Sequence, residues 1–251
     1  MPYTFGAIYK ENAFFPKNIA NLQEPYIFRD FRGQAIQMVP FQYNPVTRGL
    51  RVYTSVKVEI TPTGQKGKNI FSRISAPEKI DNQYAAIYDR HFLNASNQKY
   101  TPLGEDGKML VITYGTFAET MQPFIDWKIQ KGQQIEMVNL STVGTTASAI
   151  KTYITNYYNN NGLTFVLLVG DAEQIPSLNS SGDSDVAYGY ITGNDAYPEV
   201  MIGRFSGANV NEIATQVART VNYEKTPMAD AVWYSKYIGI GSEQGEGQGD
   251  D

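Results

Sequence analysis

Residues 165–176, FVLLVGDAEQIP, decide the class of fold. The first five residues are apolar without interruption, which is typical of a strand buried on both faces of a parallel sheet. The run then ends in Gly-Asp instead of an ordinary polar turn. In parallel sheets, ligand sites gather beyond the carboxyl ends of the strands. Asp171 therefore lies where a site is expected.

Strands and helices alternate on both sides of this stretch. The joints between them are short, which implies right-handed crossovers and a mainly parallel sheet with helices on both faces, an α/β fold. Helical spacing of apolar residues, with a Ser/Thr or Asn start and often a Gly stop, predicts helices over residues 117–131, 145–161 and 209–226. Strands are predicted over residues 108–115, 134–140, 186–193, 199–206 and 235–242.

The first part of the chain differs from the rest in composition and hydrophobic pattern. Residues 1–62 are rich in aromatic residues. In LRVYTSVKVEI (residues 50–60), apolar and polar residues alternate, which is typical of a strand with one face exposed to solvent. We therefore expect a small antiparallel β domain. Residues 63–99 are polar and mixed, and we interpret them as a linker with one amphipathic patch, residues 84–92, whose pattern is typical of a short helix. His91 lies in that patch, and we interpret it as a surface or packing histidine.

Composition excludes several functional classes. The 251 residues carry a net charge of −4 and no basic block, which argues against binding to nucleic acid or to an anionic membrane. No apolar run is long enough to span a membrane, and the first residues do not resemble a signal sequence. With no cysteine and one histidine, these residues offer no thiol nucleophile and no ordinary zinc site.

One loop carries oxygen donors at alternating positions. Asp195, the carbonyl of Tyr197 and Glu199 could wrap a hard cation, with Asp171 joining from a neighbouring strand end, and calcium is the natural candidate. The alternative is an ordinary turn, because Gly-Asn-Asp and Tyr-Pro form turns in any protein. From the residues alone, the turn is the favoured interpretation.

Several long stretches together resemble the gingipains, a family of secreted bacterial cysteine endopeptidases that cut after Arg or Lys. The matching stretches are FRGQ (31–34), PFQYNPVTRGLRVYTSVKVEI (40–60), YTPL (100–103), FIDWKIQKG (124–132), TYITNYY (152–158), FVLLVGDAEQIP and YGYITGNDAYPEVMIGRFS (188–206). The resemblance implies a caspase-like fold for residues 100–251, and protein or peptide substrates. It also implies a secreted or cell-surface protein.

The same resemblance assigns roles to particular residues. It implies that residues 1–62 end a prodomain that packs on the catalytic domain and keeps it latent, and that the chain is processed between Lys99 and Tyr100. It places a structural calcium ion at Asp171, Asp195, Tyr197 and Glu199. Glu243 matches the carboxylate that orients the catalytic histidine, which must hold the right tautomer to activate a thiol.

The family's catalytic histidine and cysteine are expected after Asp251, so we expect these 251 residues alone to be inactive. The leading hypothesis is a fragment of a gingipain-like zymogen. The alternative is a non-catalytic caspase-like scaffold that binds calcium or peptides.

Overall fold

A four-stranded parallel sheet forms the centre of the molecule. The computed structural model describes residues 5–61, 63–72, 79–95, 101–102, 106–180 and 182–239. The sheet consists of β9 (Met109–Thr113), β10 (Ile135–Asn139), β11 (Phe165–Val169) and β14 (Met201–Phe205), in the order β10-β9-β11-β14. Every neighbouring pair is parallel, and β11 lies between β9 and β14. The predicted parallel sheet around residues 165–169 is confirmed.

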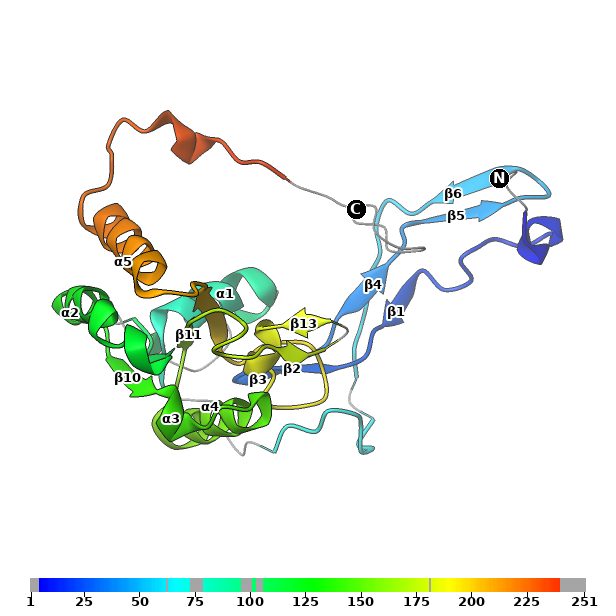
Figure 1. Ribbon diagram of the computed structural model, residues 1–251. Helices are drawn as coiled ribbons and strands as arrows, with labels where there is room; N and C mark the ends of the chain where they lie inside the picture. Colours follow the sequence, from blue (N-terminus) through cyan, green and yellow to red (C-terminus); the bar gives the residue numbers. More distant parts are fainter. Residues whose placement is uncertain are drawn as a thin grey trace.

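Helices cover both faces of this sheet (Figure 1). Helices α2 (Gln122–Gln130) and α5 (Val210–Lys225) lie on one face, and α3 (Leu140–Val143) and α4 (Ala147–Asn161) lie on the other. Successive residues of β9 point to opposite faces, as strand geometry requires. Val111 packs with α2 and α5, whereas Leu110 and Ile112 pack with α3 and α4.

Side-chain caps fix where the two longest helices begin. The Thr146 side chain accepts a hydrogen bond from the Ala149 backbone amide at the start of α4, and the Asn209 side chain accepts from the amides of Asn211 and Glu212 at the start of α5. These bonds satisfy amides that have no partner within the helix. Gly162 ends α4 with a positive φ of 67°, as its position in the sequence predicts.

Shorter elements connect the sheet to its surroundings. Strands β12 (Leu178–Asn179) and β13 (Asp183–Ser184) form an antiparallel pair. The 3-10 helices are η1 (Ala7–Lys10), η3 (Gly115–Phe117), η4 (Glu119–Met121), η5 (Val186–Gly189) and η6 (Val232–Ser235). The strand predicted over residues 186–193 is wrong, because η5 lies there. Residues 236–239 of the strand predicted over 235–242 are not in a strand either.

Antiparallel strand pairs form the first part of the chain. The pairs are β1 (Ala20–Leu22) with β4 (Ile36–Met38), β2 (Tyr26–Phe28) with β3 (Phe31–Gly33), and β5 (Phe41–Asn44) with β6 (Gly49–Val52). The strand predicted to extend to residue 60 ends at Val52.

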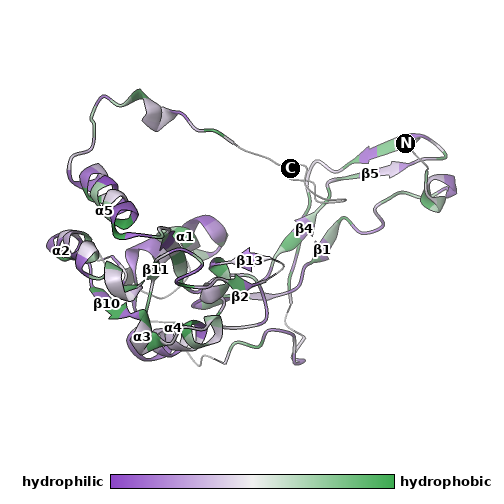
Figure 2. Ribbon diagram, in the orientation of Figure 1, coloured by the Kyte–Doolittle hydropathy of each residue, from purple (hydrophilic) through white to green (hydrophobic). Residues whose placement is uncertain are grey.

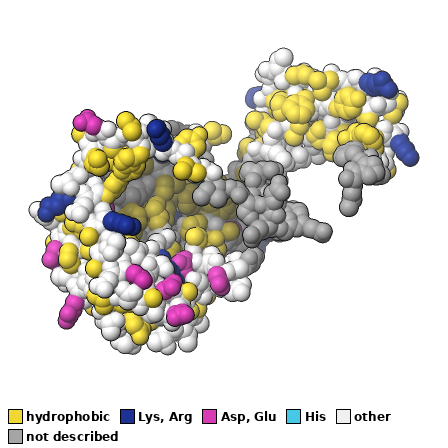
Figure 3. All heavy atoms as spheres, turned by 45° about the horizontal axis from the view of Figure 1, so that its top comes forward, with side chains coloured by type: hydrophobic (Ala, Val, Ile, Leu, Met, Phe, Trp, Pro, Cys, Tyr) yellow, Lys and Arg dark blue, Asp and Glu magenta, His cyan; other side chains and the backbone are white. Residues whose placement is uncertain are grey.

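Strands β1, β4, β5 and β6 form a narrow arm that projects from the body of the molecule (Figure 1). Figure 2 shows hydrophobic residues in β4 and β6, and Figure 3 shows hydrophobic side chains gathered on the surface of the arm. The exposed large side chains there include Phe41, Leu50 and Val52.

The hairpin β2–β3 belongs to the body and not to the arm. It packs with β7 (Lys79–Ile80) and helix α1 (Asn82–His91), and β7 pairs in parallel with β8 (Thr101–Pro102). Tyr84 and Tyr88 of α1 are 1% and 0% exposed. The part of the predicted linker that contains β7 and α1 is therefore a piece of the core.

Candidate functional site

The carboxyl end of the sheet carries Asp171, on the loop after β11. One of its carboxylate oxygens accepts hydrogen bonds from the Ala172 amide and the Ser206 hydroxyl, each at 2.9 Å. These hydrogen bonds hold the pKa of Asp171 below its usual value. Gly170, just before it, has a φ of 142°, a conformation that favours glycine. The loop thus presents a charged carboxylate at this end of the sheet.

Arg204 of β14 holds the loops that surround Asp171. Its guanidinium donates two hydrogen bonds to the carboxylate of Asp185, at 2.7 and 2.6 Å, and two more to the carbonyls of Gly170 and Ile175, each at 2.9 Å. The hydrogen bonds from Arg204 lower the pKa of Asp185. A guanidinium that donates two parallel hydrogen bonds to a carboxylate fixes the relative orientation of the two side chains and also stabilises the charged carboxylate.

The amino end of the sheet carries a second acidic loop. Glu199 precedes β14 and is completely buried. Its Oε2 accepts hydrogen bonds from the amides of Ile191 and Thr192, at 2.6 and 2.9 Å. Its Oε1 is buried and has no hydrogen-bond partner among the described residues. Burial raises the pKa of Glu199, and the two amides offset part of that rise.

Lys151 of α4 holds the same loop from the other side. Its ammonium group donates to the carbonyls of Ala187, Tyr188 and Tyr190. Burial lowers the pKa of Lys151, while the charge of Glu199 acts in the opposite direction. The backbone carbonyls of this loop are therefore bound by a lysine, and its amides are bound by Glu199.

Asp195 and Tyr197 lie in the loop that leads to Glu199. Asp195 accepts hydrogen bonds from the Tyr197 amide at 3.2 Å and from the Ile27 amide of β2 at 2.8 Å. The side chain of Tyr197 stacks on Tyr26, with ring centroids 4.3 Å apart. The first part of the chain thus contacts this loop directly.

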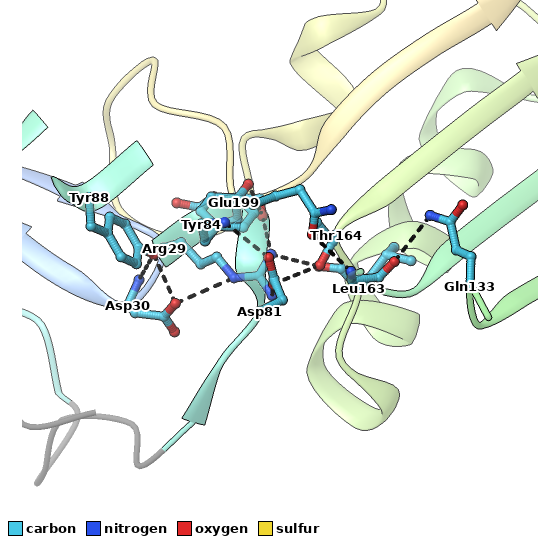
Figure 4. Close-up of polar contacts among 11 residues, drawn as sticks. Arg29, Asp30, Asp81, Tyr84, Tyr88, Gln133, Leu163, Thr164 and Glu199 are labelled. Carbon is cyan, nitrogen blue, oxygen red and sulfur yellow. Dashed lines mark hydrogen bonds and ion pairs between the residues drawn. The ribbon is translucent and has the colours of Figure 1, made fainter. Parts of the chain in front are cut away.

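Arg29, at the tip of the β2–β3 hairpin, completes the contact (Figure 4). Its guanidinium donates to the carbonyls of Leu163 and Glu199, at 2.7 and 3.0 Å, and lies 3.4 Å from a carboxylate oxygen of Asp81. It also lies 4.1 Å from the ring centroid of Tyr84. Its φ of 48° turns the chain sharply at the tip.

The structure brings together only some of the predicted metal ligands. Asp195, Tyr197 and Glu199 share one loop at the amino end, but Asp171 lies at the carboxyl end. A five-residue strand separates these ends by about 16 Å. Within the described residues, no group of three or more His, Cys, Asp or Glu side chains could hold a metal ion.

The remaining predicted positions divide into two groups. Glu243, Lys99 and Tyr100 lie outside the described residues. His91 lies among aromatic rings, and its Nε2 is 2.7 Å from the Tyr26 hydroxyl, in keeping with a packing histidine.

The sequence did not point to Arg29, Lys151 or Arg204. Each binds backbone carbonyls that come from distant parts of the chain, so neither its spacing nor its neighbours in sequence reveal its role. The only local feature that sets Arg29 apart is its position next to apolar residues in YIFRDF (residues 26–31).

The family model for "Peptidase family C25" matches residues 103–251. The chain belongs to peptidase family C25. The model for the C25 propeptide matches residues 1–92. The C25 chain therefore joins propeptide residues, which include Arg29, Asp81 and α1, to peptidase residues that include the whole parallel sheet.

Relatives of this C25 chain come from Porphyromonas gingivalis. Gingipain R1 is 38% identical over 98% of the chain, which covers 25% of that relative, and gingipain R2 is 38% identical over 98%, which covers 34%. Lys-gingipain W83 is 25% identical over 95% of the chain and 14% of that relative. The chain thus spans about a third or less of the length of these relatives.

Several solved structures match part of the chain. "Complex of Porphyromonas gingivalis RgpB pro- and mature domains" is 41% identical, covers 47% of this chain and 29% of that one, and has a TM-score of 0.45. "Crystal structure of the Arg specific cysteine proteinase gingipain R (RGPB)" is 40% identical, covers 49% and 30%, and has a TM-score of 0.46.

No helix within the described residues is long and apolar enough to cross a membrane.

Proposed function

We propose that this chain is the end of a propeptide and the first part of the peptidase of a gingipain-like cysteine endopeptidase. The observation that carries the proposal is the 38% identity to gingipain R1 over 98% of the chain. The 251 residues contain no cysteine, so the thiol nucleophile is supplied by residues outside them. The lower identity to Lys-gingipain, 25%, favours cleavage after Arg over cleavage after Lys.

In this proposal the 251 residues position the reaction and do not carry it out. A thiolate attacks the carbonyl of the scissile bond, and a histidine takes up and returns the proton. Glu243 orients that histidine. The parallel sheet supplies a rigid support, and Arg204 fixes the loops beside Asp171 at its carboxyl end.

An activity assay tests the proposal. The 251-residue chain and a version extended by the residues that follow it in its gene are incubated with peptide p-nitroanilides that end in Arg or Lys. We expect turnover from the extended protein only, faster after Arg, and abolished by iodoacetamide. Turnover by the 251 residues alone, or turnover that survives thiol alkylation, would contradict the proposal.

We also propose that the whole protein is secreted or held at the cell surface and is cut between Lys99 and Tyr100. The support is the relation to the gingipains and the basic residue before that bond. N-terminal sequencing of the peptidase recovered from the culture medium checks both points. The expected sequence begins with Tyr100, and a different first residue would reject this processing site.

We further propose that the loop before β14 binds calcium through Glu199, Asp195 and the carbonyl of Tyr197. The support is the buried Oε1 of Glu199, which lacks a partner among the described residues, together with the nearby carboxylate of Asp195. Bound calcium would supply positive charge to this loop. Asp171 is left out, because it lies at the other end of the sheet.

Melting temperatures test the calcium proposal. A ligand that binds only the folded state raises its stability. We expect calcium to raise the melting temperature of the wild-type chain relative to EGTA, and not that of Glu199→Gln. The variant keeps the shape of the side chain and an acceptor for the amides of Ile191 and Thr192. Asp171→Asn is the matched control and should respond like the wild type. Equal melting of the wild type in calcium and EGTA would remove the proposal.

A further inference from the structure

The contact between propeptide and peptidase is built around one buried guanidinium. The Arg29 side chain is 12% exposed and lies between propeptide residue Asp81 and the peptidase carbonyls of Leu163 and Glu199. Those carbonyls precede β11 and β14, so Arg29 meets the amino ends of two neighbouring strands. Figure 4 shows Arg29 at the centre of this group of polar side chains.

The partners of Arg29 are themselves bound across the same boundary. The Tyr84 hydroxyl donates to the Glu199 carbonyl at 2.7 Å, and the Thr164 hydroxyl donates to Asp81 at 2.9 Å. Charged hydrogen bonds that are this well buried are costly to lose, because water does not replace them fully.

An apolar cluster surrounds the polar centre. Tyr26, Phe28, Ile80, Tyr84 and Tyr88 of the propeptide are buried together, and Tyr197 and Met201 of the peptidase pack against them. Burial of aromatic rings supplies most of the stabilisation in such a contact, while polar groups fix its geometry.

Further contacts join residues on either side of the predicted cut. Strand β7 pairs with β8, and the Gln83 side chain accepts a hydrogen bond from the Gly107 amide at 2.9 Å. The Ile27 amide donates to Asp195. Non-covalent contacts of this kind do not require an intact chain between residues 95 and 101.

We propose that residues 26–33 and 79–92 form a docking module for the amino end of the peptidase sheet, with Arg29 as the positioning residue that keeps the module in place after the chain is cut. The proposal rests on the proposed function, in which this bond is processed. The added points are that the propeptide docks at the amino end of the sheet and that Arg29 holds it there. The module leaves the carboxyl end, with Asp171 and Ser206, uncovered.

Release of the cut module measures the role of Arg29. A recognition sequence for a rare-cutting protease is inserted between Asn97 and Gln98 of the full chain, the purified protein is cut, and the release rate of the propeptide piece is followed by gel filtration. We expect the wild-type pieces to elute together in native buffer. Arg29→Met should release the piece at least about tenfold faster, since it loses charged hydrogen bonds at a buried site.

Arg32→Met is the matched control, because Arg32 lies in the same hairpin and donates to carbonyls of Lys68 and Asn69 at an exposed site. It should release the piece at the wild-type rate. Wild-type pieces that separate at once, or equal release rates for the two variants, would overturn the proposal.

If uncut Arg29→Met lacks a folded near-ultraviolet circular dichroism spectrum, Arg29→Lys replaces it. Lysine keeps the charge but loses the planar fork that reaches two carbonyls and a carboxylate. A wild-type release rate for Arg29→Lys would then overturn the role of Arg29. Failure of the peptidase assay would not affect this experiment, because the added protease makes the cut.

Discussion

Glu224, near the end of α5, accepts hydrogen bonds from three side chains at the end of α2. The donors are the ammonium groups of Lys128 and Lys131, at 2.7 and 2.9 Å, and the indole of Trp127, at 3.0 Å. Burial alone would raise the pKa of Glu224, but these donors outweigh it and lower the pKa to about 2. One carboxylate therefore ties together the two helices on this face of the sheet.

Glu224→Gln should lower the free energy of unfolding by about 2 kcal/mol at pH 7, the usual contribution of hydrogen bonds to a charged group. Because the folded pKa lies below the unfolded value near 4.5, the stabilisation is complete above that pH and is lost as the pH falls toward 2. Urea unfolding of both proteins between pH 3 and 7 measures this.

The exposed Glu119 provides the control, and Glu119→Gln should unfold like the wild type at every pH. A wild-type advantage over Glu224→Gln that stays constant from pH 7 to 3 would contradict the role of the Glu224 charge.

The positions of individual residues could be predicted from the sequence only in part. The position of Asp171 at the carboxyl end of a buried strand follows from the apolar run before it, and the structure has it there. The grouping of Asp171 with Asp195 and Glu199 is not found. The loop with Asp195 precedes β14, whereas Asp171 follows β11. Because β11 and β14 are parallel neighbours, these two loops lie at opposite ends of the sheet.

Helix α1 confirms the short helix predicted from the amphipathic patch at residues 84–92, but its composition hid its burial in the core. Half of its sequence, NQYAAIYDRH, is polar, and the composition of the residues around it is typical of a linker. Tyr84 and Tyr88 are four residues apart and share one face, which the structure buries. Their hydroxyl groups make this possible, because each finds a partner in the interior.

Tyr88→Phe tests that explanation for α1. The Tyr88 hydroxyl donates to Asp30 at 2.8 Å and accepts from the Asp30 amide at 3.3 Å. Its removal should lower the free energy of unfolding by about 1 to 2 kcal/mol. Urea unfolding at pH 7 provides the measurement, with Tyr237→Phe as the control, because Tyr237 is 95% exposed. Equal stability of the two variants would show that the buried hydroxyl does not matter.

The strand predicted at residues 186–193 is absent because of long-range contacts of its backbone. VAYGYITG has the residues of a strand, yet much of its backbone is hydrogen-bonded to side chains. Lys151 takes three carbonyls and Glu199 takes two amides, so this segment needs no neighbouring strand. Neither Lys151 nor Glu199 could be linked to it from sequence spacing.

For the whole molecule, the central sheet was the predictable part. Its two central strands, β9 and β11, are almost entirely apolar, and helices α4 and α5 carry recognisable caps at Thr146 and Asn209. The contact of propeptide with peptidase was not predictable in detail. It depends on pairs such as Arg29 with Leu163, which are 134 positions apart, and no local pattern carries such information.

All four strands of the central sheet run in the same direction. Every loop that enters a strand therefore gathers on one rim, and every loop that leaves a strand gathers on the other. A substitution at the amino end of the sheet can change how long the cleaved propeptide stays bound, while the loops at the carboxyl end keep their shape. Retention and chemistry could thus diverge independently among descendants of a common ancestor.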